Sequence, residues 1–242
     1  VLASAGNLSI ADIQGETDTS PYADQYVTTS GYVTGRAQYG FFIQDAEAAW
    51  SGIWVLDFGS AQINVGDEVE VSGQVLEYYN FTEIEVASSE SVNIISSGND
   101  LYDSIIINNV EEAYESVLVT VSGICNGPPN QYGEWTLSGI WIDDLMYDFT
   151  PITGQEYTIT GPLFYSFGEY KVEPRSANDI IEGLINDSVG DINNDGEVNI
   201  FDILLLINLV FGGEYNESGD INGDGILNIA DCILLVNLIL DN

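Results

Sequence analysis

The stretch Asp191-Ile-Asn-Asn-Asp-Gly-Glu-Val-Asn-Ile-Phe-Asp202 returns 29 residues later as Asp220-Ile-Asn-Gly-Asp-Gly-Ile-Leu-Asn-Ile-Ala-Asp231. Oxygen-bearing side chains occupy positions 1, 3, 5, 9 and 12 of both copies, and glycine occupies position 6. Calcium takes roughly six to eight oxygen ligands, and a loop of this layout supplies them because glycine permits the sharp turn between the first ligands and the last. The repeat therefore predicts two calcium loops, each leading into a helix.

The segments after the two loops, residues 203–211 and 232–240, are predicted helices that are almost entirely apolar. Asn208 interrupts the first and Asn237 the second. Two short helices that pack together bury about half of each circumference, so a helix that is apolar all round needs cover on its other side. We expect these helices to dock on a partner molecule or on the neighbouring part of the chain.

The loop pattern Asp-x-Asn-x-Asp-Gly-x-x-Asn-x-x-Asp, closed by Asp and duplicated without a preceding helix, resembles the dockerin family over residues 189–241. Dockerins bind cohesin modules and tether secreted proteins into assemblies, so the resemblance implies two calcium ions and a cohesin-like partner. It also implies the ligands, with Asn199 and Asn228 binding directly or through water. In the first loop they are Asp191, Asn193, Asp195, the Glu197 carbonyl, Asn199 and Asp202, and in the second Asp220, Asn222, Asp224, the Ile226 carbonyl, Asn228 and Asp231.

The positions expected to contact the partner depart from the dockerin pattern, which has Ser or Thr there and Lys or Arg in the helix. The residues of this chain at those positions are Ile200-Phe201, Ile229-Ala230, Ile207-Asn208 and Val236-Asn237. Besides cohesin docking, we therefore expect an apolar interface as a second possibility, including one to another copy of the same protein.

Composition narrows the possible functions. The formal net charge is −36, from 39 acidic residues against Arg36, Lys171 and Arg175, so binding to nucleic acid or to an anionic membrane is not expected. The absence of histidine excludes a His base, a Ser-His triad and a His-ligated zinc site. No apolar run reaches the roughly 18 residues that span a bilayer. The chain starts without Met, as expected of a processed secreted protein or a shortened one.

The residues before the loops contain an internal repeat. Gly52-Ile-Trp-Val-Leu-Asp57 reappears as Gly139-Ile-Trp-Ile-Asp-Asp144, and Phe81-Thr-Glu-Ile-Glu85 as Tyr170-Lys-Val-Glu-Pro174, at offsets of 87 and 89 residues. A period of this length is too long for a solenoid and predicts two tandem domains. Short alternating strands separated by Gly, Asn and Asp predict a small Greek-key barrel of about five strands in each.

Several motifs in this region resemble the OB-fold modules of secreted bacterial nucleases and related multidomain proteins, over roughly residues 8–183. They are Ile10–Gly15, Gly40–Asp45, Gly52–Val55, Val65–Gly73, Asp143–Tyr147 and Tyr170–Arg175. The resemblance implies accessory modules without the nuclease catalytic domain. The predicted fold class is mainly β, with two tandem OB-like Greek-key barrels, residues 1–97 and 98–183, and a small α-helical dockerin-like module with EF-hand-type loops, residues 184–242.

Aromatic residues are abundant in both predicted barrels, among them Phe42, Trp54, Trp135 and Phe164. Single-stranded nucleic acids are bound by stacked aromatics in a basic groove, and the basic groove is missing here. We therefore expect these side chains to form barrel core and protein-contact surface, with stacking on glycans as the alternative.

Other polar residues and the cysteines are expected to be structural. Lys171 and Arg175 beside Glu173 predict a surface ion pair, and Asp143-Asp144 predicts a solvated acidic pair without a partner nucleophile. Cys125 and Cys232 lie in different segments, so two buried thiols are expected, with an inter-domain disulfide as the alternative.

The sequence thus predicts a secreted or cell-surface, non-catalytic structural or adhesive protein. Its calcium-folded module is expected to mediate assembly by cohesin docking, or by self-association into an oligomer or filament. The polar segment 15–24 is expected to wrap a neighbouring copy. The alternative is an accessory fragment of a secreted nuclease or glycan-degrading enzyme that binds single-stranded nucleic acid or polysaccharide.

Overall fold

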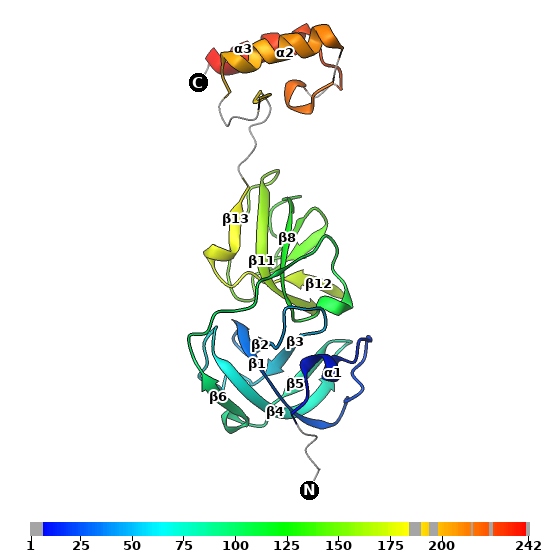
Figure 1. Ribbon diagram of the computed structural model, residues 1–242, viewed down its shortest axis with the longest axis vertical. Coiled ribbons are helices and arrows are strands. Elements are labelled where there is room, and N and C mark those ends of the chain that lie inside the picture. Colours follow the sequence, from blue (N-terminus) through cyan, green and yellow to red (C-terminus); the bar gives the residue numbers. More distant parts are fainter. Residues whose placement is uncertain (1–6, 184–189, 194–197, 214, 223–224, 241–242) are drawn as a thin grey trace. The chain divides into compact units, whose positions relative to one another are not determined.

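The structure, a computed structural model, describes residues 7–183, 190–193, 198–213, 215–222 and 225–240 (Figure 1). The chain forms two compact units, Val1–Ile181 and Glu182–Asn242. The first unit is built from strands and the second carries two α-helices, which confirms the predicted mainly β class with a helical C-terminal region. Both sheets lie within the first unit, and no boundary between them is defined. The three predicted domains, residues 1–97, 98–183 and 184–242, therefore stay predictions.

The first sheet closes into a five-stranded barrel. Its strands are β1 (Tyr26–Arg36), β2 (Gly40–Gln44), β3 (Gly52–Leu56), β4 (Glu68–Glu77), β5 (Thr82–Glu85) and the edge strand β6 (Val92–Ser96). They follow the order β1-β2-β3-β5-β4, and pairing of β1 with β4 closes the barrel. Alternate side chains of each strand, such as Val69 and Val71, fill the interior, and helix α1 (Ile10–Gln14) adds Ile10 and Ile13.

A second sheet repeats this arrangement. It contains β7 (Ile105–Ile106), β8 (Leu118–Ile124), β9 (Trp135–Leu137), β10 (Ile140–Ile142), β11 (Glu156–Ser166), β12 (Glu169–Val172) and β13 (Ile180–Glu182). The order β8-β11-β12-β10-β9 matches β1-β4-β5-β3-β2, and β10 runs parallel to β12 as β3 does to β5. Between β8 and β9, Cys125 and Leu137 form an isolated bridge where β1 and β2 form a ladder. The internal repeat is present in the strand order, whereas membership in the OB family stays a prediction.

The long strands β4 and β11 each contain a glycine near the point where the strand passes from one barrel neighbour to the next. The N-terminal part of β4 pairs with β1 and its C-terminal part with β5, and β11 pairs in the same way with β8 and β12. A Cβ atom on Gly73 would lie 2.5 Å from the carbonyl oxygen of Glu85, and one on Gly161 would lie 2.2 Å from that of Glu173. Glycine is therefore required at the point where each strand changes partner.

Aromatic side chains join the two sheets into one body. The ring centroid of Phe164 on β11 lies 5.8 Å from that of Phe42, 5.3 Å from that of Trp54 and 4.9 Å from that of Phe81. Phe42, Trp54 and Phe81 are buried, and Met146 packs against the same cluster. These rings of the first sheet serve as contact surface for the second sheet, as the sequence predicted.

Hydrogen bonds cross the same boundary. The buried Gln44 side chain accepts a hydrogen bond from Leu118 N at 2.9 Å. Arg175 Nη1 donates to the carbonyl oxygen of Thr34 at 3.1 Å. Hydrogen bonds of this kind favour one relative position of the elements they connect, which agrees with the two sheets lying in one compact unit.

The polar segment between α1 and β1 lies on its own barrel. Ser20 N donates to Glu77 Oε1 at 2.6 Å, and Asp24 N donates to the carbonyl oxygen of Val75 at 2.9 Å. The expectation that residues 15–24 wrap a neighbouring copy was therefore wrong, because this segment is already bonded to β4.

The second unit packs α2 (Ile200–Gly212) against α3 (Ile229–Leu240), around a small core of Ile192, Leu206, Cys232 and Leu235. A short 3-10 helix, η4 (Glu217–Gly219), lies between them in sequence. Among the residues that the structure describes, no helix combines the length and the apolar character needed to cross a membrane. Cys125 and Cys232 are both buried, as predicted, and each is a free thiol in the structure; the inter-domain disulfide stays the untested alternative.

Buried carboxyl groups gather where the two sheets meet. Glu115 follows the 3-10 helix η2 (Glu112–Tyr114), is 1% exposed, and accepts a hydrogen bond from Thr82 N at 3.0 Å. Its other oxygen is buried without a hydrogen-bond partner. Burial, with a further contribution from the charges of Glu112 and Glu77, raises the pKa of Glu115 from 4.5 to about 9.

We predict that Glu115→Gln removes part of the pH dependence of stability. The unfolded carboxyl ionises near its ordinary pKa of 4.5, whereas the folded one keeps its proton up to about pH 9, so its contribution to the free energy of unfolding declines between these values and is lost above them. Neutral Gln has no such decline. The Tm of the variant should therefore exceed the wild-type Tm by a margin that grows from pH 5 to pH 9, at about 2–4 °C for each kcal/mol.

Near-ultraviolet circular dichroism of tryptophan reports this transition, because all four tryptophans lie in the first unit. Glu70→Gln makes the same chemical change at an exposed position of β4 and is the matched control. Parallel Tm curves for Glu115→Gln and wild type would contradict the prediction.

Candidate metal centre

The last position of the first loop is a buried aspartate at the start of α2. Asp202 is 0% exposed, and its Oδ1 accepts hydrogen bonds from Ile192 N at 2.8 Å and Asn193 N at 3.1 Å. Its Oδ2 accepts from Asn199 N at 2.9 Å, while the Asn199 side chain caps the helix by accepting from Phe201 N. This reciprocal capping lets one carboxylate tie the beginning of the loop to the helix that follows it.

The second loop repeats this geometry at the start of α3. Asp231 is also 0% exposed, and it accepts from Asn222 N at 3.4 Å through Oδ1 and from Asn228 N at 2.9 Å through Oδ2. The Asn228 side chain in turn accepts from Ala230 N at 2.8 Å. The two loops therefore have equivalent contacts as well as equivalent sequences.

In the second loop, the turn at Gly225 (position 6) contacts the carboxylate of Asp220 (position 1). Asp220 is 7% exposed, and its Oδ2 accepts from Gly225 N at 2.7 Å and from the Tyr215 hydroxyl at 3.3 Å. Gly225 has a φ of 79°, a left-handed conformation that glycine adopts without strain. The sharp turn predicted at this position is present.

A hydrogen bond and close packing connect the two loops. Gly190 N, just before the first loop, donates to the carbonyl oxygen of Ser218, just before the second, at 2.8 Å. A Cβ atom on Gly190 would lie 2.7 Å from Cδ1 of Leu235, which places the start of the first loop against α3. Ordering of one loop therefore supports the other.

The donors present fit calcium. Asp191, Asp202, Asp220 and Asp231 are between 0% and 7% exposed. Residues 182–242 contain 12 acidic residues and no Lys, Arg or His, so no side chain of this unit can balance the charge of the buried carboxylates. Buried charge without a counter-ion is strongly destabilising, and a bound cation removes that penalty. The predicted donors are all oxygen atoms, which suit Ca²⁺ better than softer metals.

Three predicted ligands, Asp195, Glu197 and Asp224, lie outside the described residues. Asn193 and Asn222 are exposed, and the Ile226 carbonyl accepts from the Asn228 side chain at 3.0 Å. Within the described parts of the chain, no group of three or more Asp, Glu, Cys or His side chains is placed to hold a metal ion. The complete ligand set therefore stays a prediction, supported by the buried carboxylates at positions 1 and 12 of each loop.

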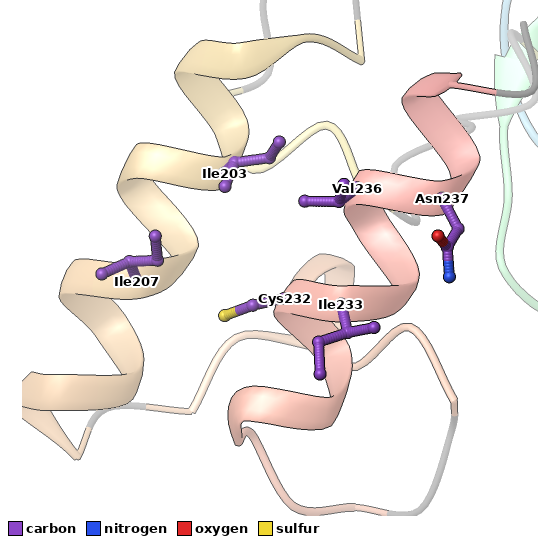
Figure 2. Close-up of a pocket in the computed structure, with 6 residues that line it drawn as sticks. All are labelled: Ile203, Ile207, Cys232, Ile233, Val236 and Asn237. Atoms are coloured by element: carbon purple, nitrogen blue, oxygen red, sulfur yellow. The ribbon is translucent and has the colours of Figure 1, made fainter.

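An apolar groove of about 220 Å³ runs between the two helices (Figure 2). Its lining residues are Ile203 and Ile207 of α2 and Cys232, Ile233, Val236 and Asn237 of α3. At the positions expected to contact a partner, Ile200, Phe201 and Ile229 are 63%, 65% and 65% exposed. The apolar surface predicted for these helices is present on the described part of the second unit.

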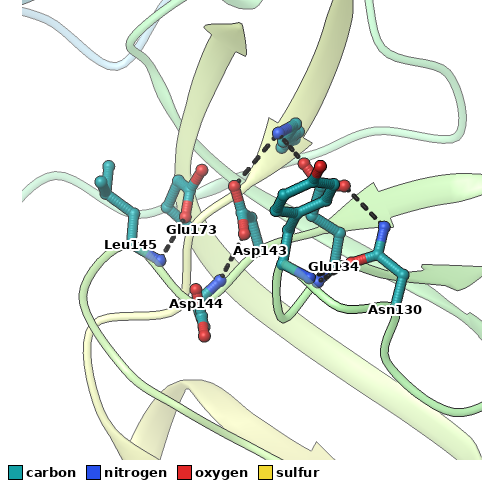
Figure 3. A network of polar contacts seen from close by, with 8 residues as sticks. Asn130, Glu134, Asp143, Asp144, Leu145 and Glu173 are labelled. Carbon is teal, nitrogen blue, oxygen red and sulfur yellow. Dashed lines mark hydrogen bonds and ion pairs between the residues drawn. The ribbon is translucent and has the colours of Figure 1, made fainter. Parts of the chain in front are cut away.

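A charge network in the second sheet corrects one expectation (Figure 3). Lys171 of β12 is 3% exposed and forms ion pairs with Glu134 and, at 3.2 Å, with Asp143. Glu173 is fully buried and accepts a hydrogen bond from Leu145 N at 3.3 Å. The expected surface ion pair of Lys171 with Glu173, and the expected solvation of Asp143, were wrong because the loop before β9 brings Glu134 onto the ammonium group.

The other two residues of these expectations, Arg175 and Asp144, have different outcomes. Arg175 pairs with Asp179 at 2.5 Å rather than with Glu173. Asp144 is exposed, as predicted. Burial and the charge of Asp143 raise the pKa of Asp144, so the neighbouring acidic residues affect this exposed carboxyl group as well.

The environment sets the protonation of this network. Burial opposes the charge of Lys171, but hydrogen bonds and charges from Glu134 and Asp143 outweigh burial and raise its pKa. The hydrogen bond from Lys171 lowers the pKa of Glu134. Burial, with the charge of Asp143, raises the pKa of Glu173 well above its usual range and favours its neutral form. Lys171 is a fixed structural cation that is already engaged by two acids.

The sequence pattern missed the residues that connect the two loops. Tyr215 and Ser218 lie in the segment between the loops and outside the repeated pattern. Their partners, Asp220 and Gly190, are set by tertiary packing rather than by spacing. The available signal was Asn216-Glu-Ser-Gly219, a turn in which the Asn216 side chain accepts from Gly219 N at 2.9 Å.

Comparison with known families identifies this part of the chain. Residues 189–240 match the family described as the dockerin type I domain, and the match includes both loops and both helices. A comparison with curated proteins gave no match. Dockerin type I domains bind calcium. The resemblance noted from the loops is confirmed: residues 189–240 form a dockerin type I domain, preceded by a β-rich region with barrel-like sheets.

Proposed function

We propose that this chain is a secreted, non-catalytic structural or adhesive protein that its C-terminal module assembles with other proteins in the presence of calcium. A dockerin type I domain implies calcium-dependent docking to cohesins. The observation that carries the proposal is the pair of equivalent loops. Each is closed by a fully buried aspartate, Asp202 or Asp231, at the start of a helix with exposed apolar residues.

Calcium acts in this proposal as the cation that the second unit lacks. One ion would be held in each loop through positions 1, 3, 5, 7, 9 and 12, beginning with Asp191 and with Asp220. At about 1,000-fold excess of free calcium over the Kd, each site adds about 4 kcal/mol to the free energy of unfolding. A unit with so small a core depends on such a contribution, so calcium controls whether α2 and α3 are presented together.

The exposed apolar side chains of the two helices supply the docking surface. Leu204 on α2 and Ile233 on α3 occupy equivalent positions of the repeat and are 54% and 58% exposed. Together with Ile200, Phe201 and Ile229 they favour a partner with an apolar face. A cohesin-like module is the first candidate partner. The same surface supports self-association, and a head-to-tail contact that does not close would give a filament.

The alternative function, binding of single-stranded nucleic acid, is less well supported by the fold. Phe42 and Trp54, which could have stacked on bases, are buried against Phe164. Arg36 pairs with Asp57 at 2.8 Å, and Lys171 is held by two acids. Without exposed aromatics and free cations on this face, phosphate groups meet only the negative charge of the chain.

We predict that Asp202→Ala combined with Asp231→Ala uncouples the second unit from calcium. Wild type in calcium should resist limited proteolysis throughout, and EGTA should expose residues 182–242 to cleavage while the β unit survives. The double variant should be cleaved in this region even in calcium, because each loop loses a ligand and the carboxylate that closes it. Mass spectrometry of the fragments reports the cleavage sites.

Glu90→Ala with Asp103→Ala is the matched control, because it removes the same charge from exposed positions of the first unit. This control should keep the wild-type cleavage pattern. Equal protease resistance of wild type in calcium and in EGTA would show that calcium does not fold the module.

We predict that Leu204→Asp combined with Ile233→Asp abolishes assembly without loss of calcium-dependent protease protection. A charge on each helix face makes desolvation of the apolar surface unfavourable, whereas neither residue belongs to a loop. Isothermal titration calorimetry with a purified cohesin module tests docking, and light scattering after size-exclusion chromatography tests self-association.

Ile181→Asp combined with Ile106→Asp introduces the same two charges at residues of the first unit that are 60% and 79% exposed, and it should leave assembly unchanged. If wild type neither binds a cohesin module nor self-associates in calcium, the proposed function is wrong. If the helix variant assembles as well as wild type, the docking surface lies elsewhere.

A further inference from the structure

A polar cleft lies within the first unit, where both sheets and the N-terminal segment meet. Its lining residues are Asp18 and Thr19 before β1, Asn80 between β4 and β5, Glu112 in η2, Tyr165 on β11 and Tyr170 on β12. The cleft has a volume of about 470 Å³. This lies in the range of roughly 300–1,000 Å³ that is typical of small-molecule sites. Residues far apart in sequence form it only because the two sheets are rigidly joined.

Two tyrosines form one wall of the cleft. Tyr165 and Tyr170 are directly opposite each other on paired strands, and their ring centroids lie 4.8 Å apart. The Tyr170 hydroxyl donates a hydrogen bond to Glu112 Oε2, which fixes the ring and the carboxylate relative to each other. A fixed aromatic surface beside fixed acceptors suits a ligand with both apolar and hydroxylated faces.

The other lining groups select the charge of the ligand. Asp18 and Glu112 supply carboxylate oxygens, Asn80 an amide and Thr19 a hydroxyl. The three cationic side chains of the chain, Arg36, Lys171 and Arg175, are all paired with acids outside the cleft. The cleft therefore has nothing to neutralise a phosphate or a carboxylate, and it favours a neutral ligand rich in hydroxyl donors.

The wall that contains Asp18 and Thr19 is pre-organised. The neighbouring Ser20 donates its N–H to Glu77 Oε1 at 2.6 Å, and the Thr82 hydroxyl donates to the same oxygen at 3.0 Å. Glu77 ends β4 and Thr82 begins β5, so the N-terminal segment is attached to the base of the turn that carries Asn80. A ligand would not have to order this segment, which lowers the entropic cost of binding.

The same turn carries two exposed aromatic rings directly before the lining residue Asn80 in sequence. Tyr78 and Tyr79 precede Asn80, are 62% and 81% exposed, and have ring centroids 4.8 Å apart. Tyr79 and Asn80 have φ angles of 53° and 69°, a left-handed conformation that is uncommon for residues with a side chain. Such strain is typically retained at functional positions, and here it turns a large ring toward solvent beside a lining residue.

We propose that this cleft binds a neutral oligosaccharide. A sugar ring offers an apolar C–H face to a tyrosine and several hydroxyl donors to carboxylate and amide oxygens, which are the two kinds of group that line the cleft. One sugar unit occupies the cleft beside Tyr170 and Glu112, and the adjoining unit stacks on Tyr79. The site belongs to the first unit, so its affinity is independent of calcium and of the docking surface.

Isothermal titration calorimetry of the full chain tests this proposal with soluble neutral hexasaccharides built from glucose, xylose or mannose. At least one should bind with a Kd of about 1 mM or lower, equally in calcium and in EGTA. Tyr79→Ala and Asp18→Asn should each weaken binding by about five- to tenfold, through loss of stacking or of an acceptor charge. Both residues are exposed, so the variants should keep the wild-type Tm.

Phe58→Ala is the matched control for Tyr79→Ala. Phe58 is 63% exposed and has a φ of 52°, close to the 53° of Tyr79. It follows the C-terminal end of β3, which runs parallel to β5, and so lies at the other end of that strand pair from the turn at Tyr79. Phe58→Ala should bind sugar as wild type does.

Three outcomes would overturn the proposal. The first is that none of the hexasaccharides binds, and the second is that Tyr79→Ala and Asp18→Asn bind as tightly as wild type. The third is that calcium chloride alone, added to the Asp202→Ala, Asp231→Ala double variant, gives heat that a further Glu112→Gln change abolishes. That result would assign the cleft to a cation. Failure of cohesin docking would leave this site unaffected.

Discussion

The C-terminal unit has 12 acidic residues and no side-chain cation, so its buried carboxylates have no counter-ion within the unit. Hydrogen bonds from backbone N–H groups hold Asp202 and Asp231 in place, but they do not neutralise them. Because the unit has no cation of its own, we propose that calcium from solution balances these carboxylates, which would couple folding of the unit to a divalent ion. In the proposed function, the ion therefore determines whether two helices with exposed apolar residues are presented as one surface.

The first unit also has an excess of acidic residues, but their charge is balanced in a different way. Each of its three cations is paired: Arg36 with Asp57, Arg175 with Asp179, and Lys171 with two acids. Other acids are buried without a cation, and for Glu115 and Glu173 burial raises the pKa so that the neutral form is favoured. A proton performs there the role that we propose for calcium in the second unit, so we expect the stability of the β unit to depend on pH and that of the helical unit to depend on calcium.

The sequence predicted those features that depend on local spacing. The loops and the apolar helices that follow them repeat at a fixed interval, and the strand pattern returns near 88 residues later; in the structure the strand order is the same in both copies. Contacts between distant segments could not be read in this way. Lys171 appeared to be a surface residue because Glu134 reaches it only in the folded sheet, and the cleft required Asp18, Glu112 and Tyr170 to meet across the junction of two sheets.

That junction also explains why the aromatic face of the first sheet is covered while the polar cleft next to it is open. Phe164 fills the face of the first sheet where Phe42 and Trp54 lie, so those rings stabilise the pair of sheets instead of a ligand. The same strand, β11, continues to Tyr165, which lines the cleft next to it. Covering the first face and building the second are therefore consequences of one packing arrangement. Since neither involves the calcium loops, the sugar binding that we propose for the β unit and the docking that we propose for the helical unit depend on different residues.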